Sequence, residues 1–206
     1  MEKIDTAKNT VLTEAEQENQ YISFYTKGDV FSNFFECKFD IDGETYDSTE
    51  QYLFSEKASQ MGDKENADRI KRNREAKICK AIGEKDVKWT DTLAKWREFA
   101  TGKLRVANLA KYSQNPKLRK ILFDTHPCIL VEANPHDTYW GVGLKKTDRD
   151  IQDKNKWKGQ NAMGFLLMEI REELLKDPSM KIVERKRSLG SPDSQTRTKR
   201  SSITST

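Results

Sequence analysis

The chain of 206 residues has 37 Lys and Arg against 33 Asp and Glu, and 34% of its residues are charged. Its 9% of aromatic residues argue against wholesale disorder, and its length suits one domain with its own hydrophobic core. No stretch comes near the ~18 apolar residues of a membrane span, and no signal-peptide pattern opens the sequence. We therefore expect a cytoplasmic or nuclear protein that does not contact membranes.

The cysteines and histidines give no metal-binding pattern. Cys37, Cys79 and Cys128 are odd in number and have no CxxC spacing, and the chain has only 2 histidines. We expect buried free thiols, no metal and no cofactor, in a protein that works as a monomer.

The excess positive charge lies at the C-terminal end. Residues 177–206 hold seven basic and three acidic residues, a surplus of four that equals the formal net charge of +4. The rest of the chain is balanced and shows no overall bias toward phosphate backbones. Because residues 177–206 are rich in Ser and Thr and lack hydrophobic periodicity, we expect a disordered tail. Its cations suit contact with nucleic acid, and a merely solvated tail is the alternative.

Residues 1–20 are polar and are expected to form a flexible arm, and the domain is expected to span residues 21–176. The segment YISFYT, from residue 21, has the aromatic and β-branched content of a strand. Alternating apolar residues on both sides of Asp42-Gly43 predict a hairpin. Residues 64–83 are expected to form a charged helix ended by Gly83, and residues 92–114 one or two helices stopped by Asn115-Pro116. KLRKILFDT, which follows, predicts another turn or two of helix.

The segment DSTEQYLFSEKASQMGD, residues 47–63, predicts a short helix with an unusual face. With Ser48 as the N-cap and Gln51 as its capping-box partner, one side of the helix carries Glu50, Leu53, Phe54, Lys57 and Met61. The two charged residues are then about two turns, roughly 10 Å, apart along the axis. The helix dipole explains a first-turn carboxylate, and snorkelling explains a lysine on an apolar face. A functional site explains both at once.

The C-terminal half predicts a buried strand, a loop and a closing helix. CILVEANP is a continuous apolar run of strand length, and it leads into the loop HDTYWGVG. GQNAMGFLLMEIREELLKD predicts an amphipathic helix whose core-facing residues are Met163, Leu166, Leu167, Ile170 and Leu174. The elements together predict a compact, mostly helical α+β domain with a few short strands.

Two loops contain candidate ligand-binding residues. In the loop after CILVEANP, Asp137 either caps a turn or takes part in a site. Beside it Trp140 offers a stacking face, and Gly141 would let the backbone approach a ligand. In FSNFF, Ser32 and Asn33 are polar groups of a loop, whereas the phenylalanines suit the core. A lone tryptophan such as Trp96 or Trp157 is more often a core or rim residue.

Several segments occur in the order seen in the NADAR, or YbiA-like, family. They are GDVFSNFFECKF, YDSTEQYLFSEKA, KW, QNPKLRKILFDT, LVEANPHDTYWGVG and WKGQNAMGFLLMEIREEL. The similarity covers about residues 23–175, and its most specific parts are the Glu-Gln-Tyr helix, the Asp-x-x-Trp-Gly loop and Trp-x-Gly-Gln-Asn. On these motifs the chain is identified as a member of that family.

The resemblance implies N-glycosidase chemistry on a nucleotide-like ribose. It implies catalytic roles for Glu50, Lys57 and Asp137 and pocket-shaping roles for Phe31, Ser32, Asn33, Trp96, Trp140 and Asn161. Ala162 and Met163 replace a larger aliphatic pair, which leaves the pocket volume open. The favoured substrate is ADP-ribosylated guanine in nucleic acid or guanosine nucleotides. There are two alternatives. One is an early intermediate of riboflavin biosynthesis, which is a small ribosylamino-pyrimidine phosphate, and the other is a module that binds ADP-ribose without cleaving it.

The chemistry of a ribosyl C–N bond assigns tasks to these residues. Positive charge develops at the anomeric carbon and negative charge on the departing base, so a carboxylate near the sugar and a proton source near the base are needed. Glu50 and Asp137 are expected to divide these tasks. Lys57 is either an electrostatic clamp on the substrate or a nucleophile that forms a Schiff base with the opened ribose.

Overall fold

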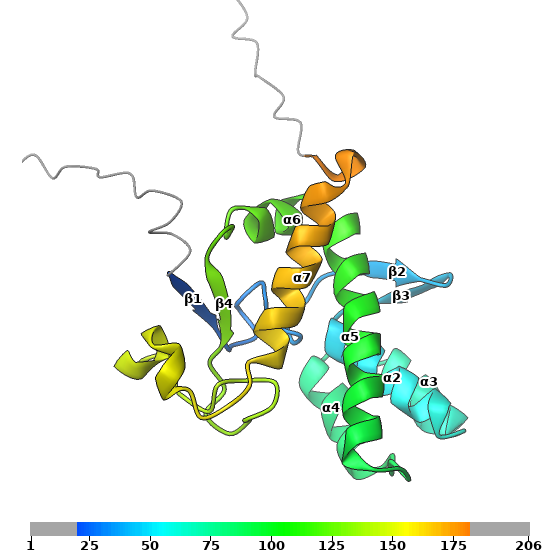
Figure 1. Cartoon of the computed structure of the whole chain (residues 1–206). Helices are drawn as coiled ribbons and strands as arrows, with labels where there is room; N and C mark the ends of the chain where they lie inside the picture. The colour runs from blue at the N-terminus through cyan, green and yellow to red at the C-terminus, as the bar shows by residue number, and fades with distance from the viewer. Residues whose placement is uncertain (1–19, 182–206) are drawn as a thin grey trace, which may run out of the picture.

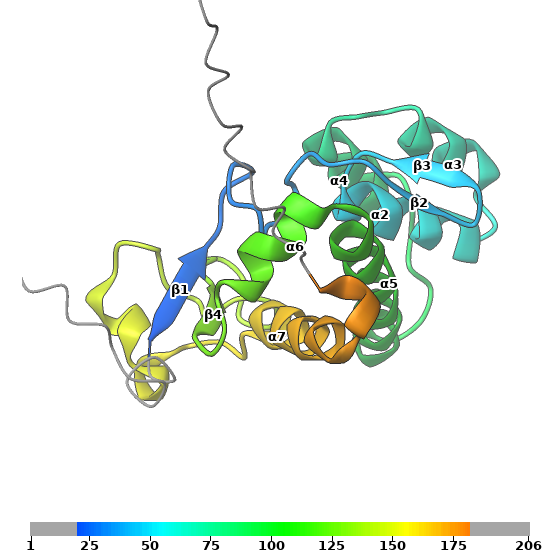
Figure 2. The ribbon, with the colours of Figure 1, turned by 90° about the horizontal axis from the view of Figure 1, so that it is seen from above.

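The computed structural model describes residues 20–181, in which a small parallel strand pair and a group of helices flank two long central helices. The central pair, α5 (Leu93–Gln114) and α7 (Ala162–Lys176), packs side by side. Figures 1 and 2 show the strands β1 and β4 on one side of this pair and α2, α3 and α4 on the other. The predicted mostly helical α+β fold is confirmed.

Two pairs of strands occur in the described chain. β1 (Tyr21–Phe24) pairs in parallel with β4 (Ile129–Glu132), in a register that sets Phe24 opposite Glu132. Because parallel strands end at the same edge, the loops that follow β1 and β4 meet there. β2 (Phe39–Ile41) and β3 (Glu44–Tyr46) form the predicted hairpin. Its turn residues Asp42 and Gly43 have φ of 53° and 82°, the positive values that a type I′ turn requires.

Helix α2 (Thr49–Gln60) is buried on nearly all sides because α3 (Lys64–Lys71), α4 (Ala76–Lys85) and α5 surround it. Ser48 is its N-cap, as predicted, and its hydroxyl accepts a bond from the backbone N–H of Gln51 at 3.1 Å. The side chain of Gln51 accepts from the Asp47 N–H at 2.7 Å instead of from Ser48. The amide nitrogen of Gln51 donates to backbone carbonyls at and just after the end of α3. The nearest of them is the Asn73 carbonyl, at 2.7 Å. The helix start is therefore tied to its neighbour.

The single helix predicted over residues 64–83 is wrong. The structure has two helices, α3 and α4, and Gly83 lies inside α4 instead of ending it. A Cβ on Gly83 would lie 2.0 Å from the Phe54 ring, so the glycine permits close packing of α4 on α2. A glycine that serves packing cannot be told from one that ends a helix by its position in the sequence.

The C-terminal elements follow the prediction closely. α5 is one uninterrupted helix, and Pro116 opens the next, α6 (Pro116–Phe123). The five apolar residues predicted to face the core from α7 are all buried. Between β4 and α7 lie the 3-10 turns η1 (Arg149–Gln152) and η2 (Lys154–Lys156). A last turn, η3 (Pro178–Met180), follows α7.

Some predictions concern segments at the ends of the chain. The predicted arm, apart from residue 20, and the predicted tail, apart from residues 177–181, lie outside the described residues. Within residues 20–181, no helix is long and apolar enough to cross a membrane. All 3 cysteines are free, and Cys79 and Cys128 are buried as expected, whereas Cys37 is half-buried.

Candidate active site

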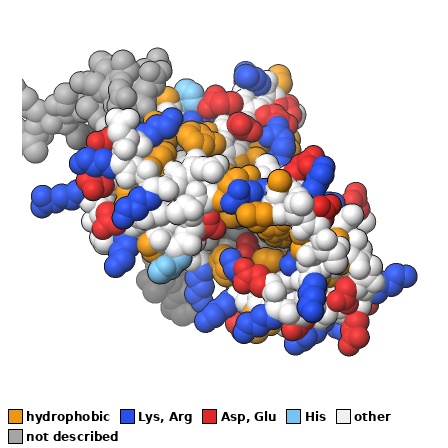
Figure 3. Space-filling view, turned by 60° about the horizontal axis from the view of Figure 1, so that its bottom comes forward, with side chains coloured by type: hydrophobic (Ala, Val, Ile, Leu, Met, Phe, Trp, Pro, Cys, Tyr) orange, Lys and Arg blue, Asp and Glu red, His pale blue; other side chains and the backbone are white. Residues whose placement is uncertain are grey.

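A pocket of about 260 Å³ opens where α2, α4 and α5 face the loops that follow β1 and β4. Figure 3 shows this face of the molecule, with acidic and hydrophobic side chains around a hollow. The predicted residues that line the pocket are Ser32, Asn33, Glu50, Trp96, Asp137 and Trp140. Residues about 100 positions apart in the sequence thus converge on one cavity.

Glu50 stands on the helical wall, in the first turn of α2, and is 5% exposed. Its backbone N–H donates to the Asn33 carbonyl at 3.1 Å, which joins the loop after β1 to the helix. Its carboxylate lies 3.6 Å from the ammonium of Lys80 on α4, which also lies 3.6 Å from Glu84. Burial raises the pKa of Glu50 to about 7, although the charge of Lys80 opposes the rise.

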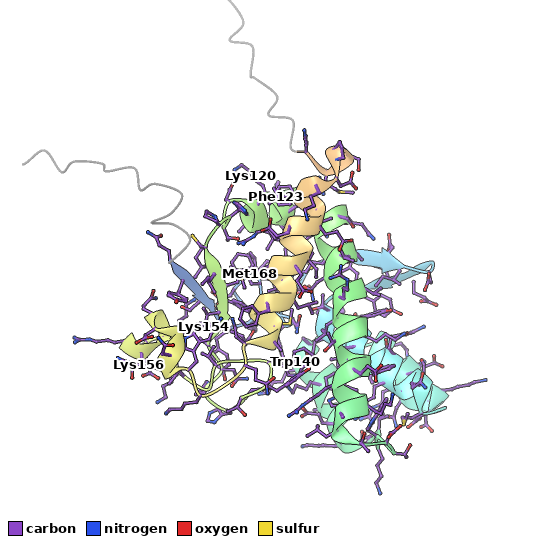
Figure 4. The ribbon with its side chains drawn as sticks, in the orientation of Figure 1. Lys120, Phe123, Trp140, Lys154, Lys156 and Met168 are labelled. Carbon is purple, nitrogen blue, oxygen red and sulfur yellow. The ribbon has the colours of Figure 1, made fainter. Side chains whose placement is uncertain are left out.

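Asp137 stands on the opposite wall, in the loop after β4. One of its carboxylate oxygens accepts bonds from the backbone N–H groups of Tyr139 and Trp140, both at 2.8 Å. Asp137 therefore caps a turn, as one of its two sequence interpretations predicted, and it also lines the pocket. Its part in a site stays a prediction. Figure 4 shows Trp140, which this turn positions, on the side of the loop that faces α5.

Lys57 is 6% exposed and, with Glu50, belongs to the buried face that the register predicted. Its ammonium is not part of the pocket lining. It donates to the carbonyls of Gly83 at 2.7 Å and Val87 at 2.9 Å, and it lies 5.2 Å from the ring centre of Trp96. Burial lowers the pKa of Lys57. The side chain therefore fastens the end of α4 to α2 from behind the aromatic wall of the pocket.

Three other predicted pocket residues also lie behind the lining. Phe31 is 7% exposed and packs edge-to-face on Phe24 in the core, with ring centres 5.7 Å apart. Gly141 packs tightly on β4, because a Cβ there would lie 2.9 Å from the Glu132 carbonyl. Asn161 is fully buried and joins the start of α7 to β4. Phe31, Gly141 and Asn161 thus hold the pocket walls in place from behind, without lining the pocket themselves.

The geometry agrees with the relationship of the chain to known proteins. Residues 21–175 match the NADAR domain. The chain belongs to the NADAR family. It is 34% identical over 168 residues to Protein irg-1 of Caenorhabditis elegans, covering 75% of this chain and 79% of that one. It is 35% identical over 150 residues to N-glycosidase R617 of Acanthamoeba polyphaga mimivirus, covering 70% and 86%.

A solved structure extends the comparison to the fold. The NMR structure of the Escherichia coli protein YbiA superposes on the chain with a TM-score of 0.64 and 29% sequence identity, covering 82% of this chain and 92% of YbiA. In sequence comparison, N-glycosidase YbiA of Escherichia coli is 31% identical over 156 residues. The membership predicted from the motifs is thus confirmed.

The pocket of this NADAR domain contains functional groups that the sequence analysis missed. Lys80 and Glu84 line it from α4, and Glu132 and Asn134 line it from the end of β4. The sequence contains one sign that points to Glu132 as a site residue, because it is the only charged residue in the otherwise apolar run CILVEANP. No such sign distinguishes Lys80 and Glu84, since they belong to a segment that is charged throughout.

Glu132 is the last residue of β4, and its backbone is held from two sides. Its N–H donates to the side-chain oxygen of Asn161 at 2.9 Å, and its carbonyl accepts from Val142 at 3.0 Å. Burial, together with the nearby carboxylates of Glu50 and Asp137, raises the pKa of Glu132 to about 8. Asn161 adopts the left-handed conformation, with φ of 56°, and its amide also donates to Leu130 at 2.8 Å.

A shallow groove of about 330 Å³ continues the pocket and shares Trp96, Asp137 and Trp140 with it. Arg97 and Tyr139 stack in this groove, with the guanidinium carbon 4.3 Å from the ring centre. Planar side chains of this kind suit the faces of nucleobases. Among residues 20–181, no group of His, Cys, Asp and Glu is arranged to hold a metal ion.

Proposed function

We propose that this NADAR protein is an N-glycosidase that hydrolyses the C–N bond between a ribose and a base. The observation that carries the proposal is that Glu50 and Asp137, from distant parts of the chain, face one pocket between Trp96 and Trp140. Relatives that match most of the chain, R617 and YbiA, are named N-glycosidases. The identity of the relatives supports the reaction class, and the carboxylates supply the chemistry that it needs.

The two carboxylates suit the two needs of the reaction. The sugar becomes positively charged as the bond breaks, and a carboxylate beside it stabilises this charge or deprotonates the attacking water. Asp137 accepts two backbone bonds at 2.8 Å, an arrangement that fixes a carboxylate in place. Glu50 lies in the drier wall, beside Lys80. One is proposed to act at the ribose and the other on the water or the leaving base.

Lys57 keeps both of its proposed roles, as an electrostatic clamp or as a Schiff-base nucleophile. Its lowered pKa suits a nucleophilic amine. Its two carbonyl partners, Gly83 and Val87, oppose that role, because the ammonium would have to leave both before it could reach an opened ribose. Borohydride trapping during turnover separates the two roles, since only the Schiff base yields a stable adduct at Lys57.

For the substrate, we favour ADP-ribosylated guanine in nucleic acid or in guanosine nucleotides. The pocket alone, at about 260 Å³, lies below the ~300 Å³ at which ligand sites begin. The adjoining groove adds room and a stacking surface at Arg97 and Tyr139, which favours the larger substrate over a ribosylamino-pyrimidine phosphate. The basic residues of the tail, 177–206, are proposed to contact the nucleic acid.

The decisive experiment compares the two substrates directly. Purified full-length protein is incubated with an ADP-ribosylated guanine oligonucleotide and, separately, with the riboflavin intermediate, and released products are identified by mass spectrometry. We expect free ADP-ribose from the first. Release only from the second would assign the riboflavin substrate, and tight binding without release would assign a non-catalytic module. Deletion of residues 182–206 should weaken oligonucleotide binding and flatten its salt dependence if the tail is in contact.

A further inference from the structure

The four carboxyl groups that line the pocket have different surroundings, and Glu84 shares the ammonium of Lys80 with Glu50. Glu50 has the ammonium of Lys80 at 3.6 Å, and Asp137 has two backbone N–H groups at 2.8 Å. The ammonium thus opposes protonation of Glu50, and the two N–H groups hold the Asp137 side chain in place. The carboxyl of Glu132 has neither a hydrogen-bond donor nor an ion pair within residues 20–181, although it lines the same cavity.

The fold holds Glu132 in this position. Along β4, Leu130 packs in the main core and Val131 in a second core, so alternation places Glu132 on the face of Leu130. The bonds of its N–H to Asn161 and of its carbonyl to Val142 keep the strand from rotating. Within the described residues, the side chain is therefore held against the pocket without a hydrogen-bond donor or an ion-pair partner.

The charges around Glu132 determine where a proton resides. The carboxyl groups of Glu50 and Asp137 line the same cavity, and Asp29 is a further acid nearby. Carboxyl groups that share a partly dry cavity favour protonation of one of them. The single cation in the pocket lining, Lys80, lies beside Glu50, and its charge opposes protonation of Glu50 and, less directly, of Glu132. The pKa of Glu132, raised to about 8, agrees with a proton that stays on this residue at neutral pH.

We infer that Glu132 is the general acid of the proposed reaction, an assignment that rests on the proposed N-glycosidase function. As the ribosyl C–N bond breaks, its electron pair moves to nitrogen, and the Glu132 carboxyl donates its proton to the departing base. Water forms the new C–O bond at the anomeric carbon and gives a proton to Asp137 or Glu50. Glu132, now ionised, regains a proton from this carboxylic acid or from solvent before the next turnover.

The test is the pH dependence of base release by Glu132→Gln. An acid must be protonated to act, so wild-type kcat/KM should fall as pH rises above about 8. Glutamine has the same size and no acidic proton. It should therefore lower kcat by about 10²- to 10⁴-fold, remove the fall at high pH and leave KM nearly unchanged. Glu84→Gln is the matched control, because it removes a charge from the same pocket lining. It should cost less rate and keep the fall.

Each outcome bears on one of the two proposals. If the wild type releases base and Glu132→Gln loses less than about threefold, or keeps the fall above pH 8, Glu132 is not the acid while the N-glycosidase function stands. If the wild type releases base from neither substrate, the proposed function fails first. Should the glutamine variant not fold, Glu132→Asp replaces it. This variant keeps an acidic proton, so we expect a lower kcat and the same decrease of kcat/KM above about pH 8. A wild-type kcat without that decrease would overturn the inference.

Discussion

The two walls of the pocket hold their carboxylates in different ways. On the helical wall, Glu50 is 5% exposed, and its charge is balanced by a side chain of a neighbouring helix, Lys80. On the loop wall, Asp137 is half-buried, and its charge is balanced by backbone N–H groups of its own turn. The first arrangement depends on the packing of two helices, α2 and α4, and the second depends on only four consecutive residues. Changes on the helical wall should therefore alter folding and activity together, and changes on the loop wall should alter activity alone.

The largest loss is expected from Glu50→Ala. It removes a carboxylate from the pocket and leaves Lys80 with only Glu84 beside it. We expect a fall in kcat/KM of about 10²- to 10⁴-fold, measured by base release. Glu50→Gln is the matched control for packing, and it should be equally inactive while melting closer to the wild type. Near wild-type activity of both variants would remove Glu50 from the site.

Asp137 allows charge and turn formation to be separated on the loop wall. Asp137→Asn keeps a side-chain oxygen for the N–H groups of Tyr139 and Trp140 and loses only the charge. It should lower kcat by about 10²-fold or more with the melting temperature unchanged. Asp137→Ala also releases the turn, so it should raise KM in addition. If the Asn variant kept full activity, Asp137 would serve the turn alone.

Lys57→Met should act mainly on stability. It leaves the Gly83 and Val87 carbonyls without their donor in a buried place, which costs about 1–3 kcal/mol of unfolding free energy. Urea unfolding measures the loss, and Lys103→Met, at a half-buried ion pair with Glu56, is the control with a smaller expected effect. A stable Lys57→Met protein without activity would contradict the supporting role and favour the Schiff-base route.

On the helical wall, the sequence predicted the local features and not their partners, for a physical reason. Local rules place Ser48 at the helix start and Glu50 and Lys57 on one face, because helix geometry fixes the spacing of side chains within the segment. The partners of that face come from elsewhere. Whether Lys57 meets substrate or two carbonyls is decided by how α4 packs, and Gly83 shows that this packing follows from contact with Phe54.

Glu132 shows the same limit on the opposite wall. Its segment was predicted to be a strand, but its place in the pocket results from parallel pairing with a strand that ends at Phe24, more than 100 residues away in the chain. No local pattern states which strand pairs with which. The sequence therefore indicated the strand and the family motifs, whereas the carboxyl without a partner emerged only from the tertiary structure.

A smaller effect is expected on stability as a function of pH. A carboxyl whose pKa is raised from 4.5 to about 8 binds its proton more tightly in the folded chain, so folding stability is lost as pH rises between these values. Glu50, raised to about 7, contributes with the same sign. Glu132→Gln removes one titrating group, and its melting temperature should fall less than that of the wild type between pH 5 and 8. An equal decrease in melting temperature for the variant and the wild type would contradict burial of the Glu132 charge.

The smallest effect separates the groove from the pocket. Arg97→Ala removes the guanidinium that stacks on Tyr139 outside the pocket lining, and a cation–π contact is worth about 1 kcal/mol. Since 1.4 kcal/mol corresponds to a tenfold change, KM for an ADP-ribosylated oligonucleotide should rise about fivefold with little change in kcat. Arg97→Lys keeps the charge without the planar face, and it should behave like the alanine variant if stacking matters. An equal change in KM for a ribosylamino-pyrimidine phosphate would show that the groove does not distinguish the larger substrate. The groove would then contact only the part that the two substrates share.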